Sequence, residues 1–379
     1  MLPMSPSPRI RLLMTADAVG GVWSYAVDLL RGLAPHGVET TLAVLGPAPT
    51  ADQRAAAAAV PGLRLLETGL PLEWLATSRA EIAASGQALA GLAREIGADL
   101  VHLNTPAPAA CAAFPAPLVI ACHSCVATWW EAVRDGPLPD DFRWRAELTG
   151  QAYAAARLLV APTAAFAAAT SRTYRLRQPP LVIYNGRRAM ARPAAVQPIP
   201  ADAAFTAGRL WDEGKDMATL DRAAARLPIP VLAAGDTRGP NGAQVELRHL
   251  RLLGRLSDTT LAHLLDTRPI FVAPARYEPF GLAVLEAAQA GCALVLSDIP
   301  GFRELWDGVA EFVQPGDDAA LAATVQHIAA DRERRVALGV AARERAERFT
   351  VETQATTMLD AYRRLLAGQC GSMQKDVAA

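Results

Sequence analysis

Short apolar runs alternate with amphipathic segments along nearly the whole chain. The apolar runs have the length of buried strands, and the amphipathic segments repeat their apolar residues at the three- and four-residue spacing of a helix. In the first half of the chain we predict strands at Arg9–Thr15, Glu39–Leu45, Asp99–Leu103, Pro117–His123, Arg157–Pro162 and Pro180–Asn185. The clearest helical patterns between them cover Trp23–Leu33 and Ser78–Ile96. Strands and helices that alternate in this way indicate parallel βαβ units.

The alternation stops near the middle of the chain and then resumes. The segment Gly186–Asp202 is rich in proline and has no period, so we interpret it as an interdomain linker. Beyond it we predict strands at Ala204–Arg209, Ile229–Gly235, Arg251–Gly254, Pro269–Pro274, Cys292–Asp298 and Ala310–Pro315. The last helical patterns are Asp317–Ala330, Arg332–Arg348 and Val351–Leu366. The pattern predicts two doubly wound α/β domains, and a length of 379 residues also favours two domains over one.

The segment Ala275–Trp306 holds the most distinctive polar residues of the second domain. Glu278 lies in the loop that leaves a predicted buried strand, and Glu286 lies on the helix that follows. The first N–H groups of a helix have no partner within it and carry the positive end of its dipole, so they suit an anion or a row of hydroxyls. These N–H groups are near Phe280, Gly281 and Leu282. The segment therefore suits a polyhydroxylated ligand; the alternative is a solvated loop with a helix-capping acid.

Further candidates follow the ends of other predicted strands, where ligands bind in doubly wound folds. Arg209 and Lys215 come after the first strand of the second domain and suit a diphosphate, with ordinary surface charge as the alternative. In the first domain, the pair Gly20 and Gly21 opens a loop to a phosphate or a sugar, although it fits neither G-x-G-x-x-G nor the Walker A motif. His123 ends another strand, and a structural role is the alternative for it.

Together these pieces resemble family 4 of the retaining nucleotide-sugar glycosyltransferases. The resemblance runs from GGVWSYAVDLLRGLAPHG through VIYNGR and GRLWDEGK to EPFGLAVLEAAQAG. Its most specific part is the E-x7-E motif, formed here by Glu278 and Glu286. One departure is the order Gly214-Lys215, because the family commonly has lysine followed by glycine after its GR strand.

The resemblance implies the GT-B fold, in which two Rossmann-like domains with doubly wound parallel sheets face each other. Its C-terminal helix crosses back to the first domain, and the segment Val351–Gly368 is amphipathic enough to do so. We expect an acceptor-side domain at 1–188, a linker at 189–202, a nucleotide-sugar donor domain at 203–349, a returning helix at 350–368 and a tail at 369–379.

The resemblance also implies roles for residues of the donor domain. Glu286 would bind the ribose of the nucleotide, and Arg209 and Lys215 would hold the diphosphate. Glu278 would act on the donor sugar together with three backbone positions, Phe280, Gly281 and Leu282. The base would be recognised near Gly254 and Arg255, mainly through backbone groups, so its identity stays open.

In the first domain the resemblance implies that Gly21 approaches donor and acceptor and that His123 contacts the transferred sugar. His123 and Glu278 are therefore the catalytic candidates. Aromatic side chains offer the one indication of an acceptor surface, with a place in the core as the alternative. They are Trp23, Trp129 and Trp130.

The implied reaction moves a hexose-type sugar from a nucleotide diphosphate sugar to a hydroxyl, with retention at the anomeric carbon. Fixed cations and helix dipoles would neutralise the leaving diphosphate, and no Asp-x-Asp motif stands where it could hold a metal, so we expect no metal or other cofactor. No enzyme nucleophile is evident on the acceptor side, which favours front-face displacement assisted by the leaving phosphate. The acceptor stays open among saccharides, lipid carriers and small molecules.

Composition and charge exclude several other partners. The chain is 51% hydrophobic and 20% charged, which is typical of globular proteins. Its net charge of -1 and the lack of a long basic stripe argue against nucleic acid. No apolar run reaches the roughly 18 residues of a membrane span, and the first residues lack a signal-peptide pattern. We therefore expect a cytoplasmic protein with at most peripheral membrane association.

Three alternatives to the glycosyltransferase remain open. A nucleotide-sugar epimerase of the same fold would need an acid and a base, for which His123 and Glu278 are the available pair. A non-catalytic sugar-nucleotide sensor could lose the cations or the second carboxylate, all of which this chain keeps. An oxidoreductase would use Cys122 and Cys125, but this C-x-x-C lacks the rest of a thioredoxin-like unit, so packing is the favoured role of both thiols.

Overall fold

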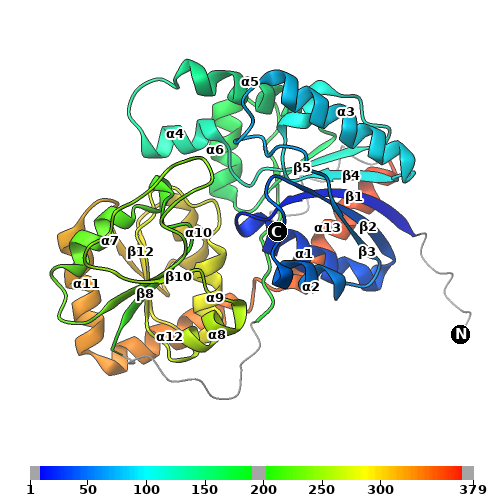
Figure 1. The fold of residues 1–379 in the computed structure, drawn as a ribbon. Coiled ribbons are helices and arrows are strands. Elements are labelled where there is room, and N and C mark those ends of the chain that lie inside the picture. Colours follow the sequence, from blue (N-terminus) through cyan, green and yellow to red (C-terminus); the bar gives the residue numbers. More distant parts are fainter. Residues whose placement is uncertain (1–8, 190–201, 369–379) are drawn as a thin grey trace, which may run out of the picture. The chain divides into compact units, whose positions relative to one another are not determined.

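The computed structural model describes residues 9–189 and 202–368, which form two α/β units (Figure 1). Unit 1 consists of the chain up to Trp130, of Asp135–Gly186 and of the chain from Val351 onward. Unit 2 consists of Glu131–Arg134 and Arg187–Thr350. The segment expected to link the domains, 189–202, lies outside the described residues except at its two ends, and the expected tail at 369–379 lies outside them entirely.

A seven-stranded parallel sheet forms the centre of unit 1, in the order β3-β2-β1-β4-β5-β6-β7. The strands are β1 (Ile10–Asp17), β2 (Val38–Leu45), β3 (Leu63–Glu67), β4 (Leu100–Leu103), β5 (Leu118–Ala121), β6 (Leu158–Ala161) and β7 (Leu181–Val182). The sequence pattern predicted all of these strands except β3. This strand lies at the edge of the sheet and is only partly buried, so its apolar pattern is weak.

Helices connect most strands of this unit, and one further helix comes from the end of the chain. They are α1 (Gly21–Leu33), α2 (Ala51–Ala58), α3 (Arg79–Glu95), α4 (Val126–Val133), α5 (Asp140–Ala155), α6 (Ala164–Tyr174) and α13 (Val351–Leu366), with the short helices η1 (Ala34–His36) and η2 (Ala107–Cys111). The last helix, α13, packs against α1 and lies among the blue elements in Figure 1. Gly32 makes this contact close, because a Cβ there would lie 2.5 Å from the Cβ of Ala355.

Unit 2 is built on a six-stranded parallel sheet in the order β10-β9-β8-β11-β12-β13. The strands are β8 (Ala204–Ala207), β9 (Val231–Ala234), β10 (Arg251–Gly254), β11 (Ile270–Ala273), β12 (Leu294–Ser297) and β13 (Glu311–Val313). The helices are η3 (Glu213–Lys215), α7 (Met217–Ala224), α8 (Asp258–Asp266), α9 (Leu282–Ala290), α10 (Pro300–Trp306), α11 (Asp318–Ala330) and α12 (Arg332–Ala346). Its core includes the fully buried side chains of Phe205, Phe271 and Trp306.

Both sheets are doubly wound, because in each the strand order reverses beside its first strand. In unit 1 the reversal falls between β1 and β4, and in unit 2 it falls between β8 and β11. The loops that leave these strands diverge at the reversal and leave room for a ligand at the carboxyl ends of the strands. The candidate loops at Gly20, Arg209 and Glu278 follow β1, β8 and β11, so three of the predicted segments lie at these two points.

A search for membrane-spanning helices covered residues 9–189 and 202–368. None of the helices there is long and apolar enough to cross a bilayer.

Two glycines of α3 give a stability test with opposite expected signs. A Cβ at Gly86 would lie 2.4 Å from the carbonyl oxygen of Pro108, a backbone atom of η2. Gly86→Ala should therefore destabilise the protein by about 1–3 kcal/mol. At Gly91 a Cβ meets nothing within 4 Å, so Gly91→Ala should stabilise it by about 0.5–1 kcal/mol through helix propensity. Urea unfolding followed by circular dichroism measures both changes, and shifts of the same sign would contradict the packing described.

Candidate functional site

The loops that follow β8 and β11 are joined to each other in unit 2. The carbonyl oxygen of Gly214 accepts hydrogen bonds from the N–H groups of Arg276, at 2.9 Å, and Tyr277, at 3.1 Å. Beside this junction, Lys215 Nζ donates to Glu278 Oε2 at 2.5 Å. The side chains of Lys215 and Glu278 are 19% and 18% exposed. The structure thus brings together the cation predicted for a diphosphate and the carboxylate predicted for a sugar.

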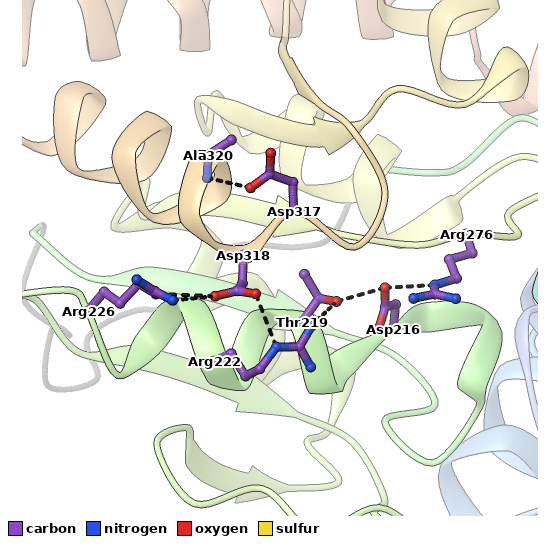
Figure 2. A network of polar contacts seen from close by, with 8 residues as sticks. All are labelled: Asp216, Thr219, Arg222, Arg226, Arg276, Asp317, Asp318 and Ala320. Carbon is purple, nitrogen blue, oxygen red and sulfur yellow. Dashed lines mark hydrogen bonds and ion pairs between the residues drawn. The ribbon is translucent and has the colours of Figure 1, made fainter.

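Asp216 contacts the side chain of Arg276, one of the two residues whose N–H groups form this junction (Figure 2). Its Oδ2 accepts from Arg276 Nε at 3.0 Å and from Thr219 Oγ1 at 2.9 Å. Asp216 has a left-handed backbone, with φ of 50°, a conformation that aspartate tolerates better than most residues. The turn after Lys215 therefore depends on a residue whose side chain also holds Arg276.

The network in Figure 2 continues from Thr219 along α7 to the start of α11. Arg222 Nη2 donates to Thr219 Oγ1 at 3.0 Å, and its Nε donates to Asp318 Oδ1 at 3.1 Å. Arg226 pairs with the same carboxylate at 3.0 Å. These contacts tie the helix that follows the Lys215 turn to a second helix of the unit, which holds the turn in place.

Arg209, the other predicted diphosphate cation, directly follows β8 and Gly208. Its Nη2 donates to Asp212 Oδ2 at 2.8 Å, and Asp212 Oδ1 accepts from the N–H of Gly214 at 3.0 Å. Burial would raise the pKa of Asp212, but the charges of Arg209 and Lys215 and the hydrogen bonds from Arg209 and Gly214 outweigh it, so the pKa is lowered. Asp212 is thus an anion that pairs with Arg209 at the end of β8 and is stabilised by the charge of Lys215.

The backbone at the start of α9 is shaped by Gly281. Its φ is 89°, which disfavours any other residue, and a Cβ there would lie 3.0 Å from Phe302 Cε1. The first hydrogen bond of the helix runs from the N–H of Leu285 to the carbonyl oxygen of Gly281. The side chain of Phe280 is buried in the core and packs edge-on against Phe349 at 5.8 Å. The predicted roles of the backbone of Phe280 and Leu282 stay a prediction.

Glu286 lies on α9 and forms an ion pair that the sequence does not predict. Arg187 Nε donates to Glu286 Oε1 at 2.6 Å. The sequence pattern placed Arg187 in the proline-rich linker segment, and 99 residues separate it from Glu286. No local spacing rule connects residues so far apart.

Arg255 joins neither of these ion pairs. It follows β10 at the edge of the sheet, its side chain is 57% exposed, and its Nε lies 3.7 Å from Asp236 Oδ2. Gly254 before it has a φ of 67°, and its carbonyl oxygen accepts from the N–H of Gly235 at 2.8 Å. The role of Arg255 in base recognition stays a prediction.

In unit 1, His123 is held at the carboxyl edge of the sheet by a residue that the sequence did not single out. His123 Nε2 lies 2.8 Å from Asn104 Oδ1. The amide of Asn104 donates to the carbonyl oxygen of Thr15 at 2.7 Å, and its backbone N–H donates to Thr15 Oγ1 at 2.9 Å. Since Oδ1 of Asn104 can only accept, Nε2 of His123 carries the proton and Nδ1 is left as an acceptor.

Burial lowers the pKa of His123 to about 4, so the imidazole is neutral near pH 7. The ring of Tyr25 packs edge-on against it, with 4.4 Å between the ring centroids. A neutral imidazole with a fixed tautomer suits hydrogen bonding to a hydroxyl rather than pairing with an anion.

The glycine loop after β1 is organised by Asp17. Its Oδ1 accepts from the N–H groups of Val19, at 2.9 Å, and Gly20, at 3.3 Å. Gly21 begins α1 and is exposed, in keeping with an approach to ligands. Trp23 is only 5% exposed and packs in the core of unit 1. The structure therefore places Trp23 in the core rather than on an acceptor surface, because it lies on the face of α1 that covers the sheet.

The other two tryptophans lie on α4 and are partly buried. The rings of Trp129 and Trp130 are 6.4 Å apart, and Trp130 also contacts Phe142 of α5 at 5.7 Å. Trp130 Nε1 donates to the carbonyl oxygen of Gly136 at 3.2 Å. These contacts support packing for much of each ring, and an acceptor role for them stays a prediction.

Glu73 is an acidic residue that no sequence motif marks. It lies in the loop between β3 and α3, and its Oε2 accepts from the N–H of Ala107 at 2.8 Å. Burial raises its pKa to about 7, and the charge of Asp17 acts in the same direction. Its position before a helix, without a recognised motif, gave no signal in the sequence.

The cysteines of the C-x-x-C motif are free thiols in the interior. Burial raises the pKa of Cys122 to about 12 and also raises the pKa of Cys125. The hydroxyl of Tyr174 donates to Cys125 Sγ at 3.1 Å. A thiol is reactive as a thiolate, and burial here disfavours that form. The packing role favoured from the sequence agrees with this environment.

Two Rossmann-like units with polar residues at their switch points define the class of protein as a GT-B glycosyltransferase, and comparisons with known proteins agree. A family model described as Glycosyltransferase Family 4 matches residues 19–188, and one described as Glycosyl transferases group 1 matches residues 243–345. The two models together match most of the chain, and they agree with the glycosyltransferase that the sequence motifs predict.

Individual relatives share part of the sequence or the whole fold. The phosphatidyl-myo-inositol mannosyltransferase of Mycolicibacterium smegmatis is 33% identical over 158 residues, which are 38% of this chain and 40% of that enzyme. Sucrose-phosphate synthase from Thermosynechococcus elongatus has a TM-score of 0.77 at 20% identity, over 95% of this chain and 100% of that one. Anabaena HepE in complex with UDP-glucose gives 0.71 at 19% identity, over 94% and 100%. These likenesses confirm the predicted GT-B fold.

The state of His123 can be measured directly. We expect its imidazole to remain neutral at pH 5.5 with the proton on Nε2, because its pKa is lowered to about 4. The unfolded chain takes up this proton near pH 6.5. The contribution of His123 to stability is therefore complete above pH 6.5 and is lost as the pH falls toward 4.

The measurement is the 15N NMR spectrum of histidine-labelled protein between pH 8 and 5, with His123→Gln used to assign the signal. Asn104→Asp serves as a second variant, because a carboxylate beside Nε2 should raise the pKa of His123. A wild-type imidazole that titrates near pH 6.5 would contradict the assignment.

Proposed function

We propose that the chain is a retaining glycosyltransferase that moves a hexose-type sugar from a nucleotide diphosphate sugar to an acceptor hydroxyl. The observation that carries the proposal is the pairing of Lys215 with Glu278 at the junction of two loops, beside the first N–H groups of α9. A cation, a carboxylate and the N-terminal end of a helix at one point match the parts of a sugar diphosphate.

In this proposal each half of the pair exchanges its partner when the donor binds. The diphosphate takes the positive charges of Lys215 and Arg209, and the hydroxyls of the sugar donate to Glu278. Both side chains are less than one fifth exposed before the donor arrives, with Lys215 at 19% and Glu278 at 18%. The pair therefore keeps two charges satisfied in a site that is already largely desolvated.

The proposed roles of the remaining donor residues follow from their positions. Glu286 lies one turn into α9, so it would bind the ribose while the start of the helix faces the sugar. In unit 1, His123 presents Nδ1 as an acceptor and would bind a hydroxyl of the transferred sugar. The neutral state of His123 argues against a role as a strong acid, and front-face displacement needs none.

The known relatives support a nucleotide-sugar donor without fixing the base, the sugar or the acceptor. One structural neighbour, HepE from Anabaena, was solved in complex with UDP-glucose. The mannosyltransferase that matches part of the chain acts, by its name, on phosphatidyl-myo-inositol. We propose a nucleotide diphosphate sugar as donor and a hydroxyl compound as acceptor, drawn from saccharides, lipid carriers or small molecules.

A donor screen tests the proposal. We expect at least one nucleotide sugar among UDP, GDP and ADP derivatives to raise the melting temperature and to be hydrolysed slowly in the absence of an acceptor. Glu286→Ala should weaken binding of that donor by about tenfold or more, because it removes hydrogen bonds to a charged group. Glu286→Gln tests the same contact while keeping the size of the side chain.

Glu344→Ala is the matched control, because Glu344 is exposed on α12 and far along the chain from the candidate loops. Analysis of the products separates transfer from epimerisation. A transferase releases the sugar from the nucleotide, whereas an epimerase leaves the sugar attached and changes its stereochemistry. If no donor stabilises the wild-type protein, the proposal fails.

We also propose that the transfer needs no resident metal ion. Arg209, Lys215 and the start of α9 would supply the positive charge that a metal supplies in other transferases. Donor hydrolysis should therefore be unchanged after treatment with EDTA. A loss of activity that Mg²⁺ or Mn²⁺ restores would contradict this proposal and would leave the identity of the donor unaffected.

A further inference from the structure

We propose that Arg187 is a positioning residue for the nucleotide, which orients Glu286 and thereby sets how strongly the site distinguishes ribose from deoxyribose. This inference rests on the proposed function, in which Glu286 binds the ribose. Arg187 is the first residue of unit 2 after the chain leaves unit 1 at Gly186.

Arg187 is held in place at both ends of its backbone unit. Its N–H donates to the carbonyl oxygen of Phe349 at 3.2 Å. Its carbonyl oxygen accepts from Gln289 Nε2 at 2.8 Å. Gln289 and Glu286 are three residues apart on α9, so they share a face of that helix. The helix that carries the carboxylate therefore also fixes the backbone of the arginine that contacts it.

The side chains of Arg187 and Glu286 are 11% and 10% exposed. A buried ion pair contributes little to stability compared with apolar residues of the same size, because both charges must be removed from water. A gain in stability alone therefore does not explain why this ion pair is present. A need to keep the carboxylate of Glu286 in one orientation does explain it. The 2.6 Å distance from Arg187 Nε to Oε1 defines that orientation.

The contact leaves Glu286 able to bind a ligand. A carboxylate has about four acceptor positions, so a carboxylate that contacts an arginine can also accept hydrogen bonds from other donors. Vicinal hydroxyls need two acceptors side by side, so they can bind only if the carboxylate does not rotate. Arg187 Nη2 is also 3.8 Å from Asp258 Oδ2, a longer contact on the opposite side of the guanidinium from the backbone. The planar guanidinium can hold this arrangement, while the point charge of a lysine cannot.

The test compares binding of ribonucleotides and deoxyribonucleotides. The probes are UDP, GDP, ADP and their 2′-deoxy counterparts, and their binding to the full-length protein is measured by isothermal titration calorimetry. We expect the wild-type protein to bind at least one ribonucleotide about tenfold or more tightly than its deoxy form, because loss of a hydroxyl leaves a buried acceptor unpaired. Arg187→Gln and Arg187→Lys should reduce this ratio to about twofold or less, mainly by weakening the ribonucleotide.

Arg188→Gln is the matched control, since Arg188 is the exposed neighbour of Arg187. It should keep the wild-type ratio. Glu286→Gln should lower the ratio as Arg187→Gln does, and the double variant should lower it no further, because the two residues act through one contact. Thermal melting shows which variants are folded, and Arg187→Lys keeps the buried positive charge if Arg187→Gln does not fold.

Two outcomes overturn the inference while the proposed function stands. One is that both Arg187 variants keep the wild-type ratio of affinities for the ribonucleotide and its deoxy form. The other is an equal loss of affinity for the ribonucleotide and its deoxy form, which would show a role in folding or in direct contact with another part of the nucleotide. If none of UDP, GDP and ADP binds the wild-type protein, the proposed function fails and the inference fails with it.

Discussion

The carbonyl oxygen of Gly214 is the point on which the candidate donor site depends. It accepts two consecutive N–H groups, those of Arg276 and Tyr277, and so joins the loop after β8 to the loop after β11. These strands are neighbours at the point where the strand order of the sheet reverses. Lys215 and Glu278 lie on these two different loops, and the shared acceptor holds the loops together. With it, a cation and a carboxylate 63 residues apart in the chain become one polar site.

The carboxylates of the E-x7-E motif illustrate how such a site stays stable before a ligand binds. Glu278 contacts Lys215 and Glu286 contacts Arg187, and all four side chains are less than one fifth exposed, between 10% and 19%. An isolated charge at such sites would be strongly unfavourable, so each acid needs a partner in the unliganded protein. The two partners differ in kind. Lysine is flexible and can turn to a phosphate, whereas the arginine is held by its own backbone.

Much of the fold could be predicted from the sequence, because buried parallel strands produce continuous apolar runs that are easy to recognise. The sequence pattern does not predict the strand β3, because β3 is a partly exposed edge strand. For Trp23 the sequence suggests an acceptor surface, because it adjoins the glycine pair, with the core as the alternative. In the structure its side chain lies on the buried face of α1 and packs in the core. Lys215 and Glu278 could be proposed from the sequence because the motifs that contain them depend on local spacing, and the structure brings their side chains together. Arg187 and Asn104 were missed because their roles depend on contacts between distant segments.

The same distinction between local and distant contacts governs the chemistry of His123. Its place at the end of β5 follows from the sequence, but its charge state does not. The charge state depends on burial beside Tyr25, and the tautomer depends on which atom of Asn104 faces the ring. The orientation of Asn104 depends in turn on Thr15, a residue of the central strand β1. Three neighbouring strands of one sheet, β1, β4 and β5, thus determine where a single proton resides, and that proton decides whether His123 can accept a hydrogen bond from a sugar.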